Sequence, residues 1–171
     1  MAIEIERRFF FDTLPEEAPK TILDMEQAYL NRKPVLRIRK KEALSQNGEA
    51  FTPAAYECTY KGKKTGAIGK EEVNLPLNEK AYLHLREKAD GILIRKKRHV
   101  YALPDGFFAE ADVFEGDYAG LKIVEVEFDS EEAAQAFTPP QWFGEEITGR
   151  KEFSNASLAY NTPSAGGEGM I

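Results

Sequence analysis

The sequence has little cysteine, no long apolar run and an excess of acidic residues. Cys58 is its one cysteine among 171 residues, which excludes an internal disulfide and a four-cysteine zinc site. No apolar stretch approaches the roughly 20 residues of a membrane span. The first residues are charged from Glu4 onward, unlike a signal peptide. We therefore expect a cytoplasmic protein without a membrane partner.

The net charge of −6 argues against general nucleic-acid binding, which normally needs a basic face. The basic residues nevertheless gather in three clusters, at 37–41, 61–64 and 95–98. Clusters of cations inside an acidic protein favour a small anionic ligand in a confined site. For any single cluster, a solvated strand face is an equal alternative. The sequence leaves the oligomeric state open.

Alternating apolar and polar residues predict a mainly β (α+β) domain over residues 1–160, followed by a disordered tail at 161–171. The strands are expected at 3–11, 35–41, 56–61, 70–75, 92–103, 107–114 and 121–128. Helices are expected at 14–30, from the N-cap Asn78 to about residue 90, at 131–137 after the N-cap Ser130, and at 152–160. Both a sandwich and a barrel are compatible with these strands.

The polar faces of the predicted strands carry full charges. Successive strand residues point to opposite faces, so charged residues two apart share a face. The residues that do so are Glu4, Glu6 and Arg8; Arg37 and Arg39; Glu57 and Lys61; Lys70 and Glu72; Lys96 and Arg98; Glu110 and Asp112; and Glu125 and Glu127. A solvent-facing side would include more Ser, Thr and Gln. This pattern favours a closed barrel with its charges inside, where about eight strands leave room for one small ligand. The apolar faces would then point outward, partly covered by the helices at 14–30 and 78–90.

A lumen of mixed charge calls for a ligand of both signs. Carboxylate pairs suit a hard divalent cation such as Mg²⁺, which also takes phosphate oxygens and water as ligands. Arginines bind phosphate oxygens bidentately. A metal-bound polyphosphate satisfies both groups, with Mg²⁺ and Mn²⁺ equally suited to oxygen ligands.

The chain resembles the CYTH superfamily, the triphosphate tunnel metalloenzymes, and in particular its short bacterial inorganic triphosphatases. The segment Glu4-Ile5-Glu6-Arg7-Arg8 stands where the superfamily carries its E-x-E-x-K motif. The likeness continues to about Tyr160. It rests on the segments 36–39, 60–62, 70–73, 96–98, 110–114, 120–127, 147–149, 154–155 and 158–159.

The resemblance implies an eight-stranded antiparallel tunnel that binds a triphosphate with a divalent metal. By position, the metal ligands would be Glu4, Glu6, Glu125 and Glu127, with Asp112 as an additional one. The phosphates would be held by Arg8, Arg37, Arg39, Lys61, Lys96 and Arg98. The residues expected to carry catalysis are Glu125, Glu127 and Arg8.

Two positions depart from the superfamily pattern. Arg8 replaces the lysine of the opening motif, and an arginine stays protonated, so it cannot act as a general base. Glu152 stands where many relatives carry a basic residue; Arg150 and Lys151 are the nearby cations. The first departure leaves a metal-activated water as the expected nucleophile.

These features predict metal-dependent hydrolysis of a triphosphate, most simply inorganic triphosphate. One metal held by Glu4 and Glu6 would bridge phosphate oxygens, and a second near Glu125 and Glu127 would orient and acidify the attacking water. Adenylate cyclisation and thiamine triphosphate hydrolysis are alternatives on the same fold. A non-catalytic polyphosphate-binding protein is a third, although anion capture alone would not need the carboxylates.

Overall fold

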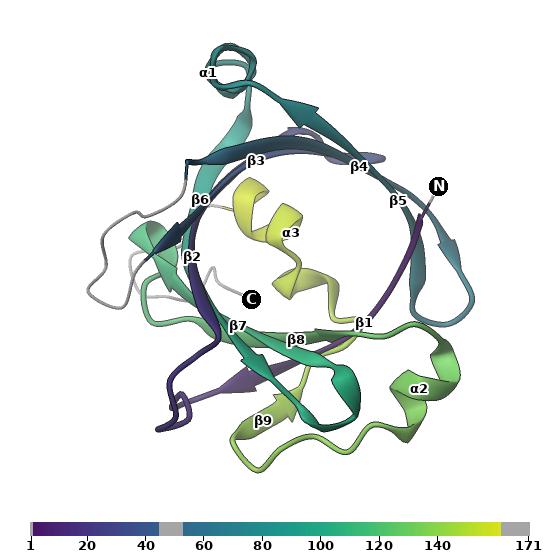
Figure 1. Ribbon diagram of the computed structural model, residues 1–171. Helices are drawn as coiled ribbons and strands as arrows, with labels where there is room; N and C mark the ends of the chain where they lie inside the picture. The colour runs from purple at the N-terminus through teal and green to yellow at the C-terminus, as the bar shows by residue number, and fades with distance from the viewer. Residues whose placement is uncertain (1, 45–52, 162–171) are drawn as a thin grey trace.

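Eight antiparallel strands close into a barrel in the computed structural model, which describes residues 2–44 and 53–161 (Figure 1). The strands follow the order β5-β4-β3-β2-β6-β7-β8-β1, and β1 pairs with β5 to close the ring. A ninth strand, β9, extends the sheet beside β1. The strands are β1 (Ala2–Phe11), β2 (Thr21–Asn31), β3 (Val35–Leu44), β4 (Ala55–Thr65), β5 (Gly69–Leu77), β6 (Asp90–Ala102), β7 (Phe108–Glu115), β8 (Lys122–Glu127) and β9 (Phe143–Glu146).

The predicted antiparallel β-barrel with few helices is confirmed, and so are all the predicted strands, with shifted ends. The barrel needs one strand more than those predicted, and β2 provides it. The helix predicted over 14–30 is therefore wrong. Its apolar residues line up equally well on a strand, where Ile22 to Tyr29 pair with β3 on one side and β6 on the other. Two such ladders satisfy the backbone of β2 on both edges.

In the described residues, three α-helices accompany the barrel: α1 (Glu79–Arg86), α2 (Glu131–Ala136) and α3 (Asn155–Tyr160). Asn78 and Ser130 are the N-caps of α1 and α2, as predicted. Their side chains accept hydrogen bonds from the backbone N–H groups of Ala81 and Ala133. The helix after Asn78 ends at Arg86, earlier than predicted. The predicted last helix divides into a 3₁₀ turn, Lys151–Phe153, and α3. The predicted disordered tail begins at Asn161, whose carbonyl accepts a hydrogen bond from the Tyr118 hydroxyl at 2.6 Å. The rest of that tail, 162–171, lies outside the described residues.

Two apolar clusters cover the outside of the barrel. Tyr82 of α1 packs on Ala28 and Ile38, which lie on the outer faces of β2 and β3. The larger cluster joins the outer faces of β1, β7 and β8 to α2 and β9, and includes Phe9, Val124 and Phe143. The outer cover thus comes from α1, α2 and β9. The segment 14–30, which was predicted to provide part of it, forms the barrel wall instead.

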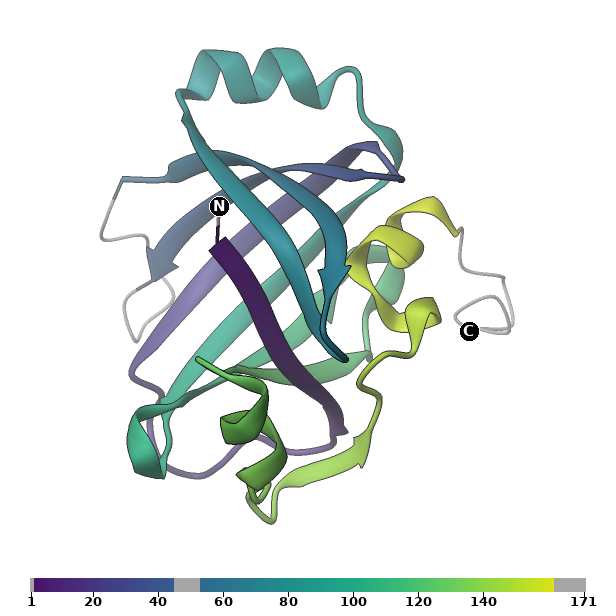
Figure 2. The ribbon, with the colours of Figure 1, turned by 90° about the vertical axis from the view of Figure 1, so that its right-hand side faces the viewer.

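A third apolar cluster fills one end of the barrel from the inside. Ile94, Phe114 and Ile123 point inward from β6, β7 and β8 and pack against α3. Figure 1 shows α3 within the ring of strands, and the side view of Figure 2 places it at one end. In residues 2–44 and 53–161, no helix has the length and apolar character needed to cross a membrane.

Candidate active site

A cavity of about 230 Å³ runs inside the barrel and is lined by charged side chains. Partners across the ladders share a face, and the pairs Arg8–Glu125, Glu6–Glu127 and Arg98–Asp112 place the predicted site residues on the inner face. The predicted residues that line the cavity are Glu4, Glu6, Arg8, Arg37, Arg39, Lys61, Lys96, Arg98, Glu125 and Glu127. Asp112 lies behind them, almost fully buried.

Glu4, Glu6 and Glu127 form a group of three carboxylates, and one oxygen from each lies within 4.8 Å of the others. Alternation along β1 brings Glu4 and Glu6 to one face, and the β1–β8 ladder places Glu127 opposite Glu6. We call these residues the carboxylate triad. Sequence alternation predicted the first pair, but only the pairing of β1 with β8 brings the third carboxylate to it.

The carboxylate triad lies in a setting that disfavours negative charge. Burial, together with Glu125 and Glu4, raises the pKa of Glu6 well above its ordinary value. Burial also raises the pKa of Glu4, although Lys61 opposes the shift. Partial burial and the charges of Glu110 and Glu125 raise the pKa of Glu127 to about 7. Three oxygen ligands that repel one another fit a divalent cation such as Mg²⁺ or Mn²⁺.

Arg98 is the centre of a second, mixed group. Its guanidinium donates to both oxygens of Asp112, at 2.7 and 2.9 Å, and to Glu125 at 2.9 Å. Lys96, 1% exposed, lies 2.7 Å from Asp112. Burial acts to raise the pKa of Glu125 and of Asp112, but the cations outweigh it and both pKa values are lowered. In the described chain these two carboxylates therefore contact the cations and lie outside the carboxylate triad.

Arg8 lies deep in the cavity, where its guanidinium group contacts two acceptors. Its Nε is 3.5 Å from Glu125, and its Nη1 donates to the Phe153 carbonyl at 2.9 Å. A guanidinium fixed in this way can contact an anion but cannot remove a proton from water.

The remaining cations come from β3 and β4. Lys61 contacts Glu4 at 3.0 Å, and Arg39 contacts Glu57 at 2.6 Å. Arg37 donates to Thr59 at 3.0 Å, while its buried Nε has no hydrogen-bond partner among the described residues. The Arg37 side chain lines the cavity, and its guanidinium group is suited to an anionic oxygen.

The chain is 37% identical over 160 residues to an inorganic triphosphatase of Nitrosomonas europaea, with 94% of this chain and 99% of that protein covered. It belongs to the CYTH superfamily, in the group of inorganic triphosphatases. An inorganic triphosphatase of Acetivibrio thermocellus is 36% identical over 106 residues, which are 60% of this chain and 64% of that protein. No protein-family model matches the chain.

Solved structures agree with this membership. A crystal structure of an inorganic triphosphatase matches with a TM-score of 0.66 and 35% identity, covering 96% of this chain and 99% of that one. A protein of Pyrococcus horikoshii, at 19% identity and a TM-score of 0.51, shares the fold over 77% of this chain and 82% of its own.

This CYTH protein carries further cavity residues that sequence reasoning did not assign to the site. Four charged residues also line the cavity: Lys41, Lys70, Glu72 and Glu110. Lys41 lies two positions after Arg39, and Glu110 two positions before Asp112, while Lys70 and Glu72 are two positions from each other. Strand alternation therefore contained the signal for them. Tyr29 and Asn155 also line it. Tyr29 was missed because residues 14–30 were predicted as a helix, and Asn155 because α3 enters the barrel only in three dimensions.

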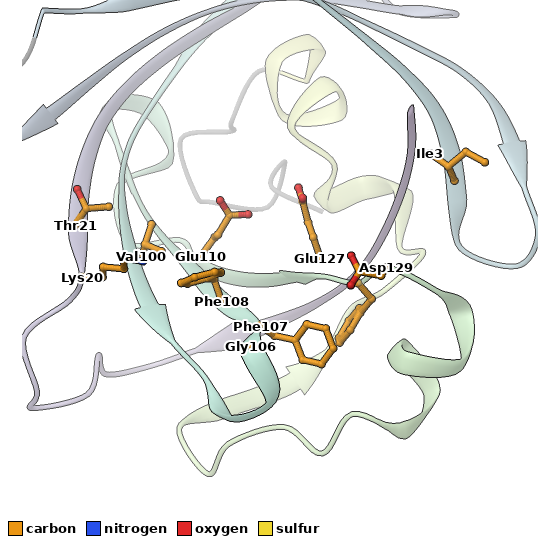
Figure 3. A pocket seen from close by; sticks show the side chains of 11 residues that line it. Ile3, Lys20, Thr21, Val100, Gly106, Phe107, Phe108, Glu110, Glu127 and Asp129 are labelled. Atoms are coloured by element: carbon orange, nitrogen blue, oxygen red, sulfur yellow. The ribbon is translucent and has the colours of Figure 1, made fainter. Parts of the chain in front are cut away.

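The end of the barrel opposite α3 opens into a wider cavity of about 680 Å³. Figure 3 shows Glu110 and Glu127 pointing from its floor toward the barrel interior. Ile3 and Phe108, 57% and 41% exposed, stand on its walls. We call this opening the mouth. Glu110 and Glu127 line both cavities, so the mouth leads directly to the carboxylate triad.

Proposed function

We propose that this protein hydrolyses inorganic triphosphate with the help of Mg²⁺ or Mn²⁺. The observation that carries the proposal is the division of the lumen into a carboxylate triad and an adjoining group of cations. A triphosphate presents several charged oxygens to the cations and, through a metal, to the carboxylates. The 37% identity to an inorganic triphosphatase over almost the whole chain supports the same substrate.

Glu4, Glu6 and Glu127 are the proposed metal ligands. A divalent metal bound there would neutralise charge on the phosphate oxygens and lower the pKa of water. The three side chains meet the requirement for oxygen donors, and burial, together with repulsion from neighbouring carboxylates, raises their pKa values. Because a proton competes with a metal for the same oxygens, metal binding is expected to release protons.

Arg8, Arg37, Arg39, Lys61, Lys96 and Arg98 are the proposed phosphate-binding cations. They stabilise negative charge that grows on the transferred phosphoryl group and on the leaving phosphate. Glu125 and Asp112 act mainly as positioning residues, because their oxygens contact Arg98, Arg8 and Lys96. A guanidinium already held by carboxylates has little rotamer freedom left to lose when phosphate binds.

The test measures phosphate release from inorganic triphosphate with Mg²⁺, with Mn²⁺ and with EDTA. We expect release only with a metal, and a loss of at least about a hundredfold in Glu127→Gln, because the metal that would stabilise transition-state charge loses one of its three proposed ligands. Glu115→Gln is the matched control, since Glu115 pairs with Lys97 on the outer face. Absence of metal-dependent release by the wild type, or near-normal release by Glu127→Gln, would contradict the proposal.

ATP and thiamine triphosphate belong in the same substrate panel, with chromatography of the products. The proposal predicts faster phosphate release from inorganic triphosphate than from either, because the cavity residues assigned above address the metal or phosphate, and none is assigned to an adenosine or thiamine group. A cyclic nucleotide as the main product from ATP would instead identify the cyclase activity.

A further inference from the structure

Arg37 is held differently from the other arginines of the lumen. Arg8, Arg39 and Arg98 each lie beside a carboxylate, at 3.5, 2.6 and 2.7 Å. Arg37 is 6% exposed and forms no ion pair within residues 2–44 and 53–161. Its Nη2 donates instead to the Thr59 hydroxyl at 3.0 Å. A neutral acceptor fixes the direction of a guanidinium group without neutralising it, so the charge of Arg37 is left for a phosphate oxygen.

A chain of hydrogen bonds with a single direction continues from Arg37 across the barrel wall. The Thr59 hydroxyl, which accepts from Arg37, donates to the Asn74 Oδ1 at 2.5 Å. The Asn74 side-chain NH₂ donates in turn to the Glu72 Oε1 at 2.8 Å. The chain begins at a guanidinium group, which can only donate, and ends at a carboxylate, which can only accept. These two ends determine the direction of each bond between them.

Strand register brings the four side chains together. Arg37 of β3 pairs with Thr59 of β4, and Thr59 pairs with Asn74 of β5. Direct partners share a face of the sheet, and Glu72 shares it too because it precedes Asn74 by two positions. Figure 1 shows the three strands side by side in the wall. Thr59 is 0% exposed, so bulk water cannot replace its contacts.

The bond to Asn74 decides what Thr59 offers to Arg37. A hydroxyl group has one proton and two lone pairs. Because Asn74 takes the proton, the hydroxyl acts toward Arg37 as an acceptor only. A guanidinium group with a fixed acceptor loses less freedom when a phosphate binds to it. The affinity for triphosphate should therefore depend on both of these neutral residues.

We propose that Thr59 and Asn74 are positioning residues that hold Arg37 in place for a phosphate of the substrate. The inference rests on the proposed triphosphatase function and adds two residues to it. The described residues that line the inner cavity include Arg37 and Glu72 but neither Thr59 nor Asn74. The two residues thus act through Arg37 and not by touching the substrate.

Thr59→Val tests this role, and Thr65→Val is its matched control. Thr65 lies on the same strand, but its hydroxyl has no hydrogen-bond partner in the described part of the chain. We expect Thr59→Val to raise KM for inorganic triphosphate about tenfold, the effect of one hydrogen bond to a charged group, with kcat less affected. Thr59→Ser keeps the hydroxyl and should restore KM. Unchanged KM in Thr59→Val, or an equal rise in Thr65→Val, would overturn the inference.

A double-mutant cycle with Arg37→Met separates positioning from a general loss of structure. Calorimetric titration with Mg²⁺ and a non-hydrolysable imido analogue of triphosphate measures binding in each variant. If Thr59 acts through Arg37, Thr59→Val should weaken binding in the wild type but change it little in the Arg37→Met background. Equal weakening in both backgrounds, or no binding by the wild type, would overturn the inference. If the wild type binds the analogue but does not hydrolyse inorganic triphosphate, the proposed function fails while this cycle still decides the inference.

Asn74→Leu tests the second residue without altering the buried hydroxyl. Asn74 is exposed, so the variant should fold like the wild type. We expect KM to rise about threefold, within the effect of one neutral hydrogen bond, because the Thr59 proton loses its acceptor. Asn31→Leu is the control, since the Asn31 side chain donates to the Pro34 carbonyl at the surface. Equal KM values for Asn74→Leu and Asn31→Leu would overturn the assignment of Asn74.

Discussion

Arg98 forms ion pairs with three carboxylates inside the barrel. It contacts Asp112, Glu125 and Glu110. Replacing it with methionine leaves these buried carboxylates with too little positive charge around them. Arg98→Met should lower the free energy of unfolding by about 3–5 kcal/mol, the usual cost of breaking a buried ion pair by removing one partner. Urea unfolding followed by circular dichroism measures this.

Arg95→Met is the control for that prediction. Arg95 precedes Arg98 by three positions on β6, but its side chain is 60% exposed and lies 3.7 Å from Glu26. An exposed ion pair contributes at most about 1 kcal/mol. Equal destabilisation by the two substitutions would mean that the Arg98 network adds nothing beyond an ordinary surface contact.

Glu127 makes stability depend on pH in a predictable direction. Its pKa is about 7 in the folded protein, above the ordinary carboxylate value of 4.5. Between these values the folded state binds more protons than the unfolded state, so the stability contributed by this group falls as pH rises. Without metal, the wild type should lose more stability than Glu127→Gln between pH 5 and 8. Thermal melts in EDTA across this range measure the difference.

The carboxylates with lowered pKa values do not contribute to the difference in stability between pH 5 and 8. Glu125 and Asp112 lose their stabilising charge only when the pH falls below the ordinary carboxylate range. Saturating Mg²⁺ should reverse the trend, because deprotonated carboxylates bind the metal more tightly at higher pH. Parallel pH profiles for the wild type and Glu127→Gln would contradict the raised pKa of Glu127.

At the scale of elements, β2 shows why local pattern is ambiguous. Its apolar residues Ile22, Leu23, Met25, Ala28 and Tyr29 fit helical spacing. The same residues divide between the two faces of a strand. Ala28 packs outward under α1, while Leu23 and Tyr29 line the cavity. The neighbours β3 and β6 decide the outcome, since a barrel leaves no edge unpaired.

The close approach of β6 and α3 gives a prediction about Gly91. This glycine has φ +65°, and a Cβ there would collide with the Ala159 carbonyl of α3. Gly91→Ala should therefore cost more than the roughly 1–2 kcal/mol of a left-handed residue. It should also weaken triphosphate binding, because it displaces the helix that carries Asn155. Chemical unfolding and calorimetric titration measure the two effects.

Gly106→Ala separates backbone strain from collision. Gly106 has φ +82°, and no neighbouring atom lies within 4 Å of the position that a Cβ would take. Gly106→Ala should therefore introduce backbone strain without a steric collision. If Gly106→Ala and Gly91→Ala destabilise equally and leave binding unchanged, α3 is not held in place at this contact.

At the scale of the whole molecule, the lumen concentrates charge that a ligand would relieve. A metal with a non-hydrolysable imido analogue of triphosphate should stabilise the fold by about 2.7 kcal/mol at a hundredfold excess over its dissociation constant. The metal alone and the analogue alone should each stabilise the fold by less than the two together. A melting temperature unaffected by all three additions would contradict a metal-triphosphate site.

Much of the site could be predicted from the sequence because a strand has a period of two. Glu4 with Glu6, Arg37 with Arg39, and Lys96 with Arg98 share faces wherever their strands lie. The division of labour among the carboxylates could not be predicted in this way. Glu125 and Glu127 share a face of β8, yet the first contacts Arg98 and the second joins the carboxylate triad.

The sequence by itself determined the β-rich barrel, the charged inner faces and most of the residues that line the lumen. These properties are local, since they depend on alternation and on residue type. Tertiary structure alone decided that residues 21–31 form a strand, that Glu127 meets Glu4 and Glu6, and that α3 closes one end. Each of these depends on contacts between residues far apart in the chain, which exist only once the ring of strands has closed.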